Sequence, residues 1–230
     1  MCTLMTTSLY TSAQVREVLD QGAQLVEVLP KEEYEESHLP KAIGIPLRKL
    51  DDEAPRRLDP RRKVVVYCWD NACDLSPRAA ARLERMGFEQ VYDYVGGKAD
   101  WLAHGLAAEG TQAGDPTAGS VARRDVETCG LDDPVSGITT PYCVVVDADG
   151  VVHGVVRRSD LGEGDGRRAE EAMKKGPSTF RPNVPIAEMA EFMSEHDLAS
   201  SPVTTSGGVL IGVIEREDAV RAAREQDAQR

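Results

Sequence analysis

The sequence has few aromatic residues, no excess of basic residues and no long apolar run. Phe, Trp and Tyr make up 5% of the 230 residues, and 27 Lys and Arg face 39 Asp and Glu, which gives a net charge of −12. A chain this acidic repels nucleic acid and anionic membrane surfaces. No apolar stretch is long enough to span a bilayer. We therefore expect neither nucleic acid nor a membrane as a partner.

The sequence also lacks the signs of secretion. Its first residues contain no basic segment followed by an apolar one, so no signal peptide is predicted. The cysteines are odd in number and scattered: Cys2, Cys68, Cys73, Cys129 and Cys143. This usage indicates reduced thiols in a cytoplasm rather than a disulfide framework. We expect Cys129 and Cys143 to be packed core residues.

Helix and strand patterns alternate through the first half of the chain. Thr11 or Ser12 can cap a helix whose apolar residues recur at helical spacing, and Ser76 with Pro77 predicts the start of another. Strands are expected at residues 25–29, 42–45, 63–67 and 91–95. This alternation predicts an α/β domain with a mainly parallel sheet covered by helices on both faces.

The second half contains an internal repeat. The residues from Val144 match those from Pro202 at a constant offset of 58. Each copy predicts a β-hairpin followed by a helix. An amphipathic helix at 186–193 precedes the second hairpin, whereas the first copy lacks most of it. We expect domains at 1–112 and 121–230, a linker at 113–120, a truncated first repeat at 121–165 and a second at 166–225.

A cysteine stands where the buried strand at 63–67 ends. Cys68 is followed by a loop and then by a helix starting near Ser76, so its thiol should lie close to the amides and positive dipole of that helix. Such a setting favours the nucleophilic thiolate, although a cysteine at a strand end is also a common core residue. A related phosphatase class uses a cysteine loop that ends in Arg, but here Asp74 lies six residues after Cys68, so phosphoryl chemistry is not expected. Cys68 and Cys73 alone make a poor metal site.

Residues 10–107 resemble a rhodanese domain. The resemblance lies in LVEVLPKEEYEESHLPKAIGIPL, VVVYC, RAAARLERMGF and VGGKADW, which occur in the family's order. It implies a sulfurtransferase whose loop cysteine takes sulfane sulfur from a small donor such as thiosulfate, holds it as a persulfide and passes it to a small nucleophilic acceptor. That cysteine is Cys68 here, and Cys73 is a second thiol able to resolve it as a disulfide. The implied substrate-binding residues are Trp69, Asn71, Ala72 and Arg78.

The sequence departs from the rhodanese pattern around this loop. Asp70 and Asp74 place carboxylates near the thiol, where they oppose its ionisation. Glu27 and Leu29 stand where the family usually has an Asp and an Arg. A catalytically inactive descendant of the fold therefore stays open.

Residues 121–222 resemble a pair of CBS motifs, on GVVRRSDL from Gly154 and GVIEREDA from Gly212. The resemblance implies an α+β regulatory module, commonly dimeric, whose cleft takes AMP, ATP or S-adenosylmethionine; no cofactor is required for the chemistry. Asp160 and Asp218 stand where the family holds ribose hydroxyls, unless they merely cap helices. Arg157 and Thr179 are further candidate nucleotide contacts. Glu215 replaces a family Thr or Ser that contacts phosphate.

Three functions follow from these patterns. The first is a sulfurtransferase tuned by a nucleotide on the CBS pair. The second is a non-enzymatic nucleotide sensor whose rhodanese-like domain only binds a protein or responds to redox state. The third is a dimeric scaffold with neither activity.

Overall fold

The structure is a computed structural model that describes residues 6–229, and Cys2 lies outside them. The chain divides after Asp115 into two compact units. Among residues 6–229, no helix has the length and apolar character needed to cross a membrane.

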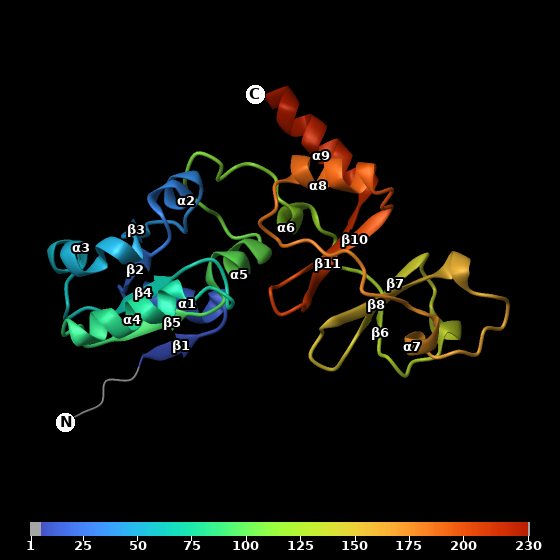
Figure 1. Ribbon diagram of the computed structural model, residues 1–230, viewed down its shortest axis with the longest axis horizontal. Helices are drawn as coiled ribbons and strands as arrows, with labels where there is room; N and C mark the ends of the chain where they lie inside the picture. The colour runs from blue at the N-terminus through green and yellow to red at the C-terminus, as the bar shows by residue number, and fades with distance from the viewer. Residues whose placement is uncertain (1–5, 230) are drawn as a thin grey trace. The chain divides into compact units, whose positions relative to one another are not determined.

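The first unit is built on a five-stranded parallel sheet (Figure 1). In spatial order its strands are β1 (Thr7–Leu9), β5 (Val91–Tyr94), β4 (Val64–Tyr67), β2 (Gln24–Glu27) and β3 (Ile43–Gly44). Every residue of the central strand β4 is fully buried, as a strand covered on both faces requires. The predicted α/β fold with a parallel sheet is confirmed.

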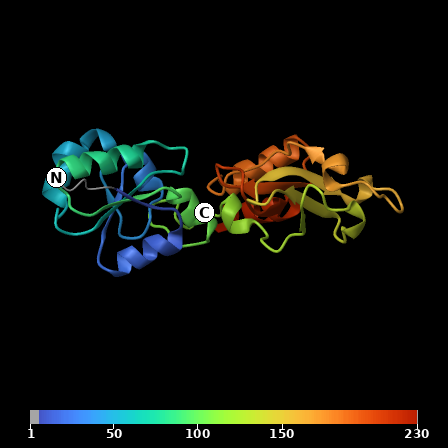
Figure 2. The ribbon, with the colours of Figure 1, turned by 90° about the horizontal axis from the view of Figure 1, so that it is seen from below.

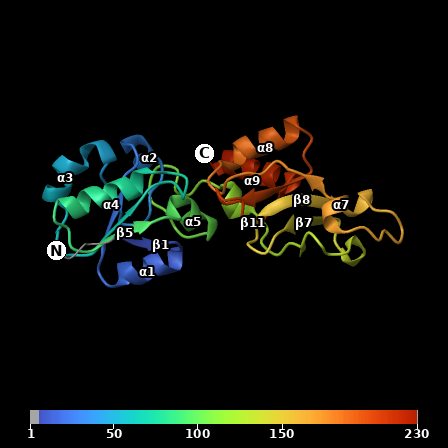
Figure 3. The same cartoon turned by 60° about the horizontal axis from the view of Figure 1, so that its bottom comes forward.

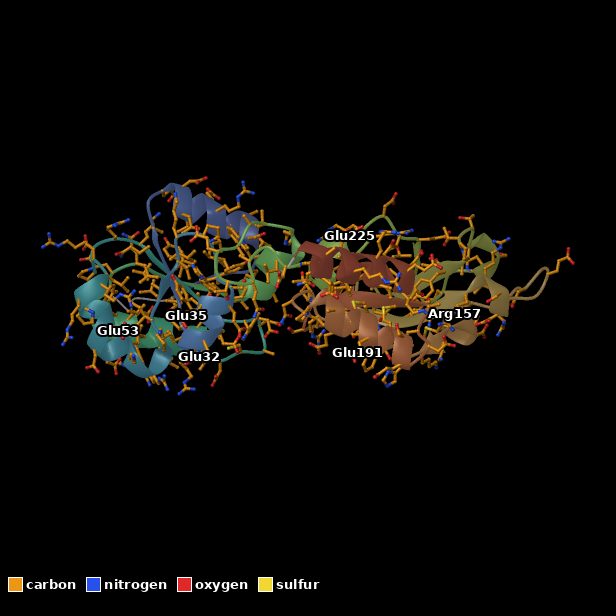
Figure 4. All side chains as sticks on the ribbon, turned by 90° about the horizontal axis from the view of Figure 1, so that it is seen from above. Glu32, Glu35, Glu53, Arg157, Glu191 and Glu225 are labelled. Carbon is orange, nitrogen blue, oxygen red and sulfur yellow. The ribbon has the colours of Figure 1, made fainter. Side chains whose placement is uncertain are left out.

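Helices cover both faces of this sheet (Figure 3). Helices α3 (Leu50–Arg57) and α4 (Leu75–Arg85) lie on one face, and α1 (Ser12–Asp20) lies on the other. Helix α2 (Lys31–Glu36) connects β2 to β3, the 3₁₀ turn η1 (Leu47–Lys49) leads from β3 into α3, and α5 (Gly97–Ala103) follows β5. Leu50 and Leu83 bury their side chains under the first pair, and Val15 buries its side chain under α1. Acidic side chains such as Glu32 and Glu53 project outward from α2 and α3 (Figure 4).

The two predicted helix starts have different outcomes. Thr11 caps α1 in a reciprocal capping box with Gln14, so of the two expected caps, Thr11 and Ser12, Thr11 is the one used. Helix α4 begins at Leu75, however, and its preceding residue is Asp74. The prediction that Ser76 caps this helix is wrong, because Ser76 lies inside the first turn and its hydroxyl is used by Cys68 instead.

The second unit contains the two hairpins of the repeat (Figure 2). One is β7 (Tyr142–Val146) with β8 (Val152–Arg157), extended by β6 (Thr128–Cys129) and β9 (Lys174–Lys175) into a four-stranded sheet; the other is β10 (Ser200–Thr204) with β11 (Leu210–Glu215). Val145 pairs with Gly154 and Val203 with Gly212, with a register shift at the next residue in both hairpins. The backbone therefore reproduces the sequence offset residue by residue.

The hairpin tips bond to one another symmetrically. The Val152 amide donates to the Gly208 carbonyl at 3.0 Å, and the Leu210 amide donates to the Gly150 carbonyl at 2.9 Å. Gly150 and Gly208 have φ of +79° and +83°, a conformation that favours glycine. The copies are thus related by a local two-fold rotation.

The helices break this symmetry. The second copy has α8 (Ile186–Glu195), whose Ile186, Met189 and Met193 are fully buried, and α9 (Arg216–Gln229). The first copy has only the 3₁₀ turns η2 (Val135–Gly137) and η3 (Arg158–Asp160) in those places. The expected helix after the first hairpin is therefore wrong: a glycine-rich stretch follows η3 and does not sustain a helix. Short helices α6 (Ala118–Val121) and α7 (Ala169–Ala172) complete the unit.

Candidate functional site

Cys68 occupies the first position after β4, beneath the loop that leads into α4. Its side chain is only 1% exposed and belongs to the apolar cluster under α3 and α4. The Cys68 Sγ donates to Ser76 Oγ at 3.3 Å and lies 3.5 Å from the Cys73 carbonyl oxygen. The Ser76 amide also points at this sulfur. Helix α4 therefore presents both a hydroxyl and an amide of its first turn to Cys68.

Burial dominates the ionisation of this thiol. It raises the pKa of Cys68 to about 12, and the neighbouring Cys73 contributes to the rise, while the hydroxyl and amide of Ser76 oppose it. The thiolate that we expected from the helix N-terminus is therefore not the resting form at neutral pH. The structure shows an enclosed thiol, and its raised pKa means that it must lose a proton before it can act.

The start of α5 holds the loop from the other side. The Lys98 amide donates to the Cys68 carbonyl at 3.0 Å, and the Ala99 amide donates to the Trp69 carbonyl at 2.9 Å. Gly97 has φ of +60°, and a Cβ there would stand 2.7 Å from both carbonyl oxygens. Glycine at this position therefore lets α5 approach the loop closely.

The predicted substrate-binding residues lie at different depths. Trp69 is half-buried against the apolar cluster, whereas Asn71 and Ala72 are exposed. Arg78 is also exposed and pairs with Asp74 at 3.3 Å. Cys73 is half-buried, so it is more accessible than Cys68.

A buried ion pair beside the loop was missed by the sequence reasoning. Lys98 Nζ lies 2.9 Å from Glu27 Oε1, and the two side chains are 1% and 0% exposed. The ammonium group also donates to the Ser37 carbonyl and lies 4.6 Å from the centre of the Trp69 ring. Burial raises the pKa of Glu27, and the charge of Lys98 opposes that rise. A charged residue inside a buried strand was the available signal for such a partner.

A cavity of about 260 Å³ opens where β2 and β3 end. Val28, Leu47 and Leu75 line it, and all three belong to or pack on the apolar cluster that holds Cys68. Arg48 also lines the cavity and brings a cation that the acidic loop itself lacks. Ligands of open parallel sheets commonly bind at the carboxyl ends of the strands, so this cavity is the candidate substrate pocket.

The second unit holds Asp218 in ion pairs. Its Oδ2 lies 2.7 Å from the Arg123 guanidinium, and its Oδ1 lies 2.6 Å from that of Arg221. Arg123 also lies 3.3 Å from Glu215. Arg123 and Glu215, with Tyr142, line a second cavity of about 260 Å³. Both oxygens that would accept ribose hydroxyls are therefore occupied in this structure.

The predicted nucleotide contacts do not line this cavity. Among residues 6–229, its lining includes Arg123, which pairs with Asp218, but not Asp218 itself, nor Asp160, Arg157 or Thr179. Asp160 is exposed in η3 and accepts from the Ser159 hydroxyl at 3.1 Å, and Thr179 is exposed before α8. Arg157 ends β8 at the surface (Figure 4).

Cys129 and Cys143 pack together in the first repeat. Their sulfurs lie 3.1 Å apart, Cys143 is buried and Cys129 is half-buried. Burial raises the pKa of both thiols. They are thus protonated core residues, as expected.

Comparison with known proteins identifies both segments. The family model for the rhodanese-like domain matches residues 11–104, and the model for the CBS domain matches residues 169–225. Thiosulfate sulfurtransferase GlpE of Coxiella burnetii is 32% identical over 80 residues, which are 35% of this chain and 72% of that protein. The BH2092 protein of Bacillus halodurans is 31% identical over 45% of this chain and 78% of its own, with a TM-score of 0.41. CBSX2 in complex with AMP is 20% identical over 49% of this chain and 98% of its own, with a TM-score of 0.43.

Proposed function

Because this chain belongs to the rhodanese family and has a CBS domain behind its rhodanese domain, we propose that it is a cytoplasmic sulfurtransferase that carries sulfur as a persulfide on Cys68. The observation that supports this is the position of the Cys68 sulfur, which follows β4 and faces the hydroxyl and amide of Ser76. The donor is a small sulfane-sulfur compound such as thiosulfate, and the acceptor is a nucleophile.

The chemistry needs only one bond exchange at sulfur. The deprotonated Cys68 sulfur attacks the outer sulfur of thiosulfate, a sulfur–sulfur bond forms, and sulfite leaves with the electron pair of the bond that breaks. The amide of Ser76 stabilises the anionic sulfur during this step. Arg48 in the neighbouring cavity is the cation that attracts the anionic donor past Asp70 and Asp74.

The rate of persulfide formation should rise steeply with pH in the alkaline range. With the pKa of Cys68 raised to about 12, its thiolate fraction grows about tenfold for each pH unit below that value. We expect the initial rate with thiosulfate, measured by peptide mass spectrometry in the Cys73→Ser variant, to follow this slope between pH 9 and pH 11. A rate that stays level over this range would show that Cys68 ionises with an ordinary pKa and that its burial is not maintained.

We also propose that the cavity between Arg123 and Tyr142 is a weak adenosine-nucleotide site. Arg123 is the cation available to phosphate there, and its present partners are the acidic groups of Asp218 and Glu215. Nucleotide phosphate must compete with these carboxylates, so charge repulsion lowers the affinity.

Replacing Glu215 with Thr should therefore strengthen binding. The change removes the repelling charge and restores the hydroxyl type that CBS motifs carry at this position. We expect millimolar AMP, ATP or S-adenosylmethionine to raise the melting temperature of Glu215→Thr by several degrees more than that of the wild type. Glu217→Thr makes the same change in the first turn of α9, two residues after Glu215 at the end of β11; it is the matched control and should behave as the wild type. No rise in either protein with any of the three ligands would remove the nucleotide proposal.

A further inference from the structure

One buried acid in the first unit, Asp93, has a carboxyl oxygen that makes no hydrogen bond within the described residues. Asp93 lies on β5 opposite Val66 of β4, and its side chain faces the same apolar layer as Cys68. The residue is only 6% exposed. Within residues 6–229, its Oδ1 is buried without a hydrogen-bond partner. Leaving a carboxyl oxygen unpaired in such a layer is costly, so the acid calls for an explanation.

Asp93 is linked to Cys68 through one side chain. The Cys68 thiol donates to Ser76 Oγ at 3.3 Å, and the Ser76 side chain in turn interacts with the Asp93 carboxyl and opposes the rise that burial causes in its pKa. Ser76 is 2% exposed, so solvent does not intervene. The thiol, the hydroxyl and the carboxyl therefore lie in one buried cluster, with Ser76 between the other two.

The other acids around the loop are engaged elsewhere. Asp70 accepts from the Ala72 amide at 2.9 Å, and Asp74 is exposed and pairs with Arg78. Glu27 pairs with Lys98, whose ammonium lies over the Trp69 ring. The second thiol beside Cys68, that of Cys73, only opposes ionisation. Asp93 is therefore the acid placed to take the thiol proton.

We propose that Asp93 is a positioning residue that draws the proton from Cys68 through the Ser76 hydroxyl. The proposal rests on the proposed sulfur transfer at Cys68. As the sulfur attacks its donor, the Cys68 proton passes to Ser76 Oγ and the Ser76 proton passes to Asp93, so no other co-reactant is needed. When the leaving sulfite or the acceptor takes that proton, the carboxylate is restored.

Burial suits Asp93 to this task. It raises the pKa of the carboxyl and so brings it nearer to that of the thiol. A base is most effective when its pKa approaches that of the group it deprotonates while it stays ionised at the working pH. The relay explains how a thiol with such a high pKa could react at neutral pH.

Asp93→Asn tests the relay, because the amide keeps the shape of the side chain and cannot take up a proton. Persulfide formation from thiosulfate and alkylation of Cys68 by iodoacetamide are both measured by peptide mass spectrometry on the full chain from pH 6 to pH 11. We expect the Asp93→Asn variant to lose about 10²-fold in both rates near neutral pH, the usual contribution of a general base. The loss should vanish at the alkaline end, where hydroxide deprotonates Cys68 directly.

Controls separate the relay from the sulfur chemistry. Asp74→Asn, which removes an exposed acid of the same loop, should lower neither rate, because that carboxylate opposes ionisation of Cys68 rather than promoting it. Ser76→Ala should lose about as much of both rates near neutral pH as Asp93→Asn, whereas Ser76→Thr, which keeps the hydroxyl, should retain most of the wild-type rates. Equal pH profiles for Asp93→Asn and the wild type would overturn the relay, whether or not persulfide forms. Alkylation that depends on Asp93 in a protein that accepts no sulfur would keep the relay and reject the proposed function.

Discussion

Cys68→Ser is expected to abolish persulfide formation, whereas Cys73→Ser retains it. Serine has nearly the shape of cysteine and preserves the contact with Ser76, but its hydroxyl cannot bond sulfane sulfur as a persulfide. The measurement is peptide mass spectrometry after incubation with thiosulfate or a polysulfide and alkylation of the products. The wild type should gain the mass of one sulfur on the Cys68 peptide, and the Cys68→Ser protein should gain none.

The pattern of label separates the competing functions. Label on Cys73 alone would move the carrier to the more accessible thiol of the loop. Absence of label on every cysteine would leave the non-enzymatic function, in which the rhodanese domain only binds a partner or responds to redox state. A folded Cys68→Ser protein, checked by its circular dichroism, excludes loss through misfolding.

Lys98→Met should destabilise the first unit by about 3–5 kcal/mol, because it leaves the carboxylate of Glu27 buried without its partner. Methionine keeps the length of the side chain, so lost packing contributes little. Both tryptophans of the chain, Trp69 and Trp101, lie in the first unit. Urea unfolding followed by tryptophan fluorescence therefore reports this unit separately from the CBS unit.

The pH dependence and a surface control sharpen this test. Burial already raises the pKa of Glu27, and a protonated Glu27 needs no charged partner. The loss of stability in Lys98→Met should therefore be small below the unfolded-state pKa of Glu27 and should grow as the pH rises above it. The double variant with Glu27→Gln should recover most of the stability, since both charges are then gone. Lys49→Met breaks only the exposed pair with Glu53 at 3.9 Å and should cost about 1 kcal/mol or less. Equal effects at Lys98 and Lys49 would contradict the role given to the buried pair.

Sequence periodicity was a good guide to the elements and a poor guide to their ends. The three valines of β4 predicted a central strand because a strand covered on both faces must be apolar throughout. Ser76 was misplaced as a helix cap because a cap and a residue of the first turn differ by only two positions, and nothing local shows where the hydroxyl points. The prediction of a helix after the first hairpin was wrong for a related reason. The repeat offset predicts the hairpin, but it does not show whether the following residues pack against an apolar surface.

The alternation of helices and strands in the first unit, the two related hairpins and the place of Cys68 at a strand end are determined by the sequence alone, because apolar spacing and turn residues act over a few neighbours. The tertiary structure decided the chemistry of the site. It brought Lys98 to Glu27 across 71 residues, Arg123 to Asp218 across 95, and Asp93 beneath Ser76. It also closed solvent away from the Cys68 sulfur. Ionisation depends on solvent access and on charges from distant parts of the chain, and these exist only once the chain has folded.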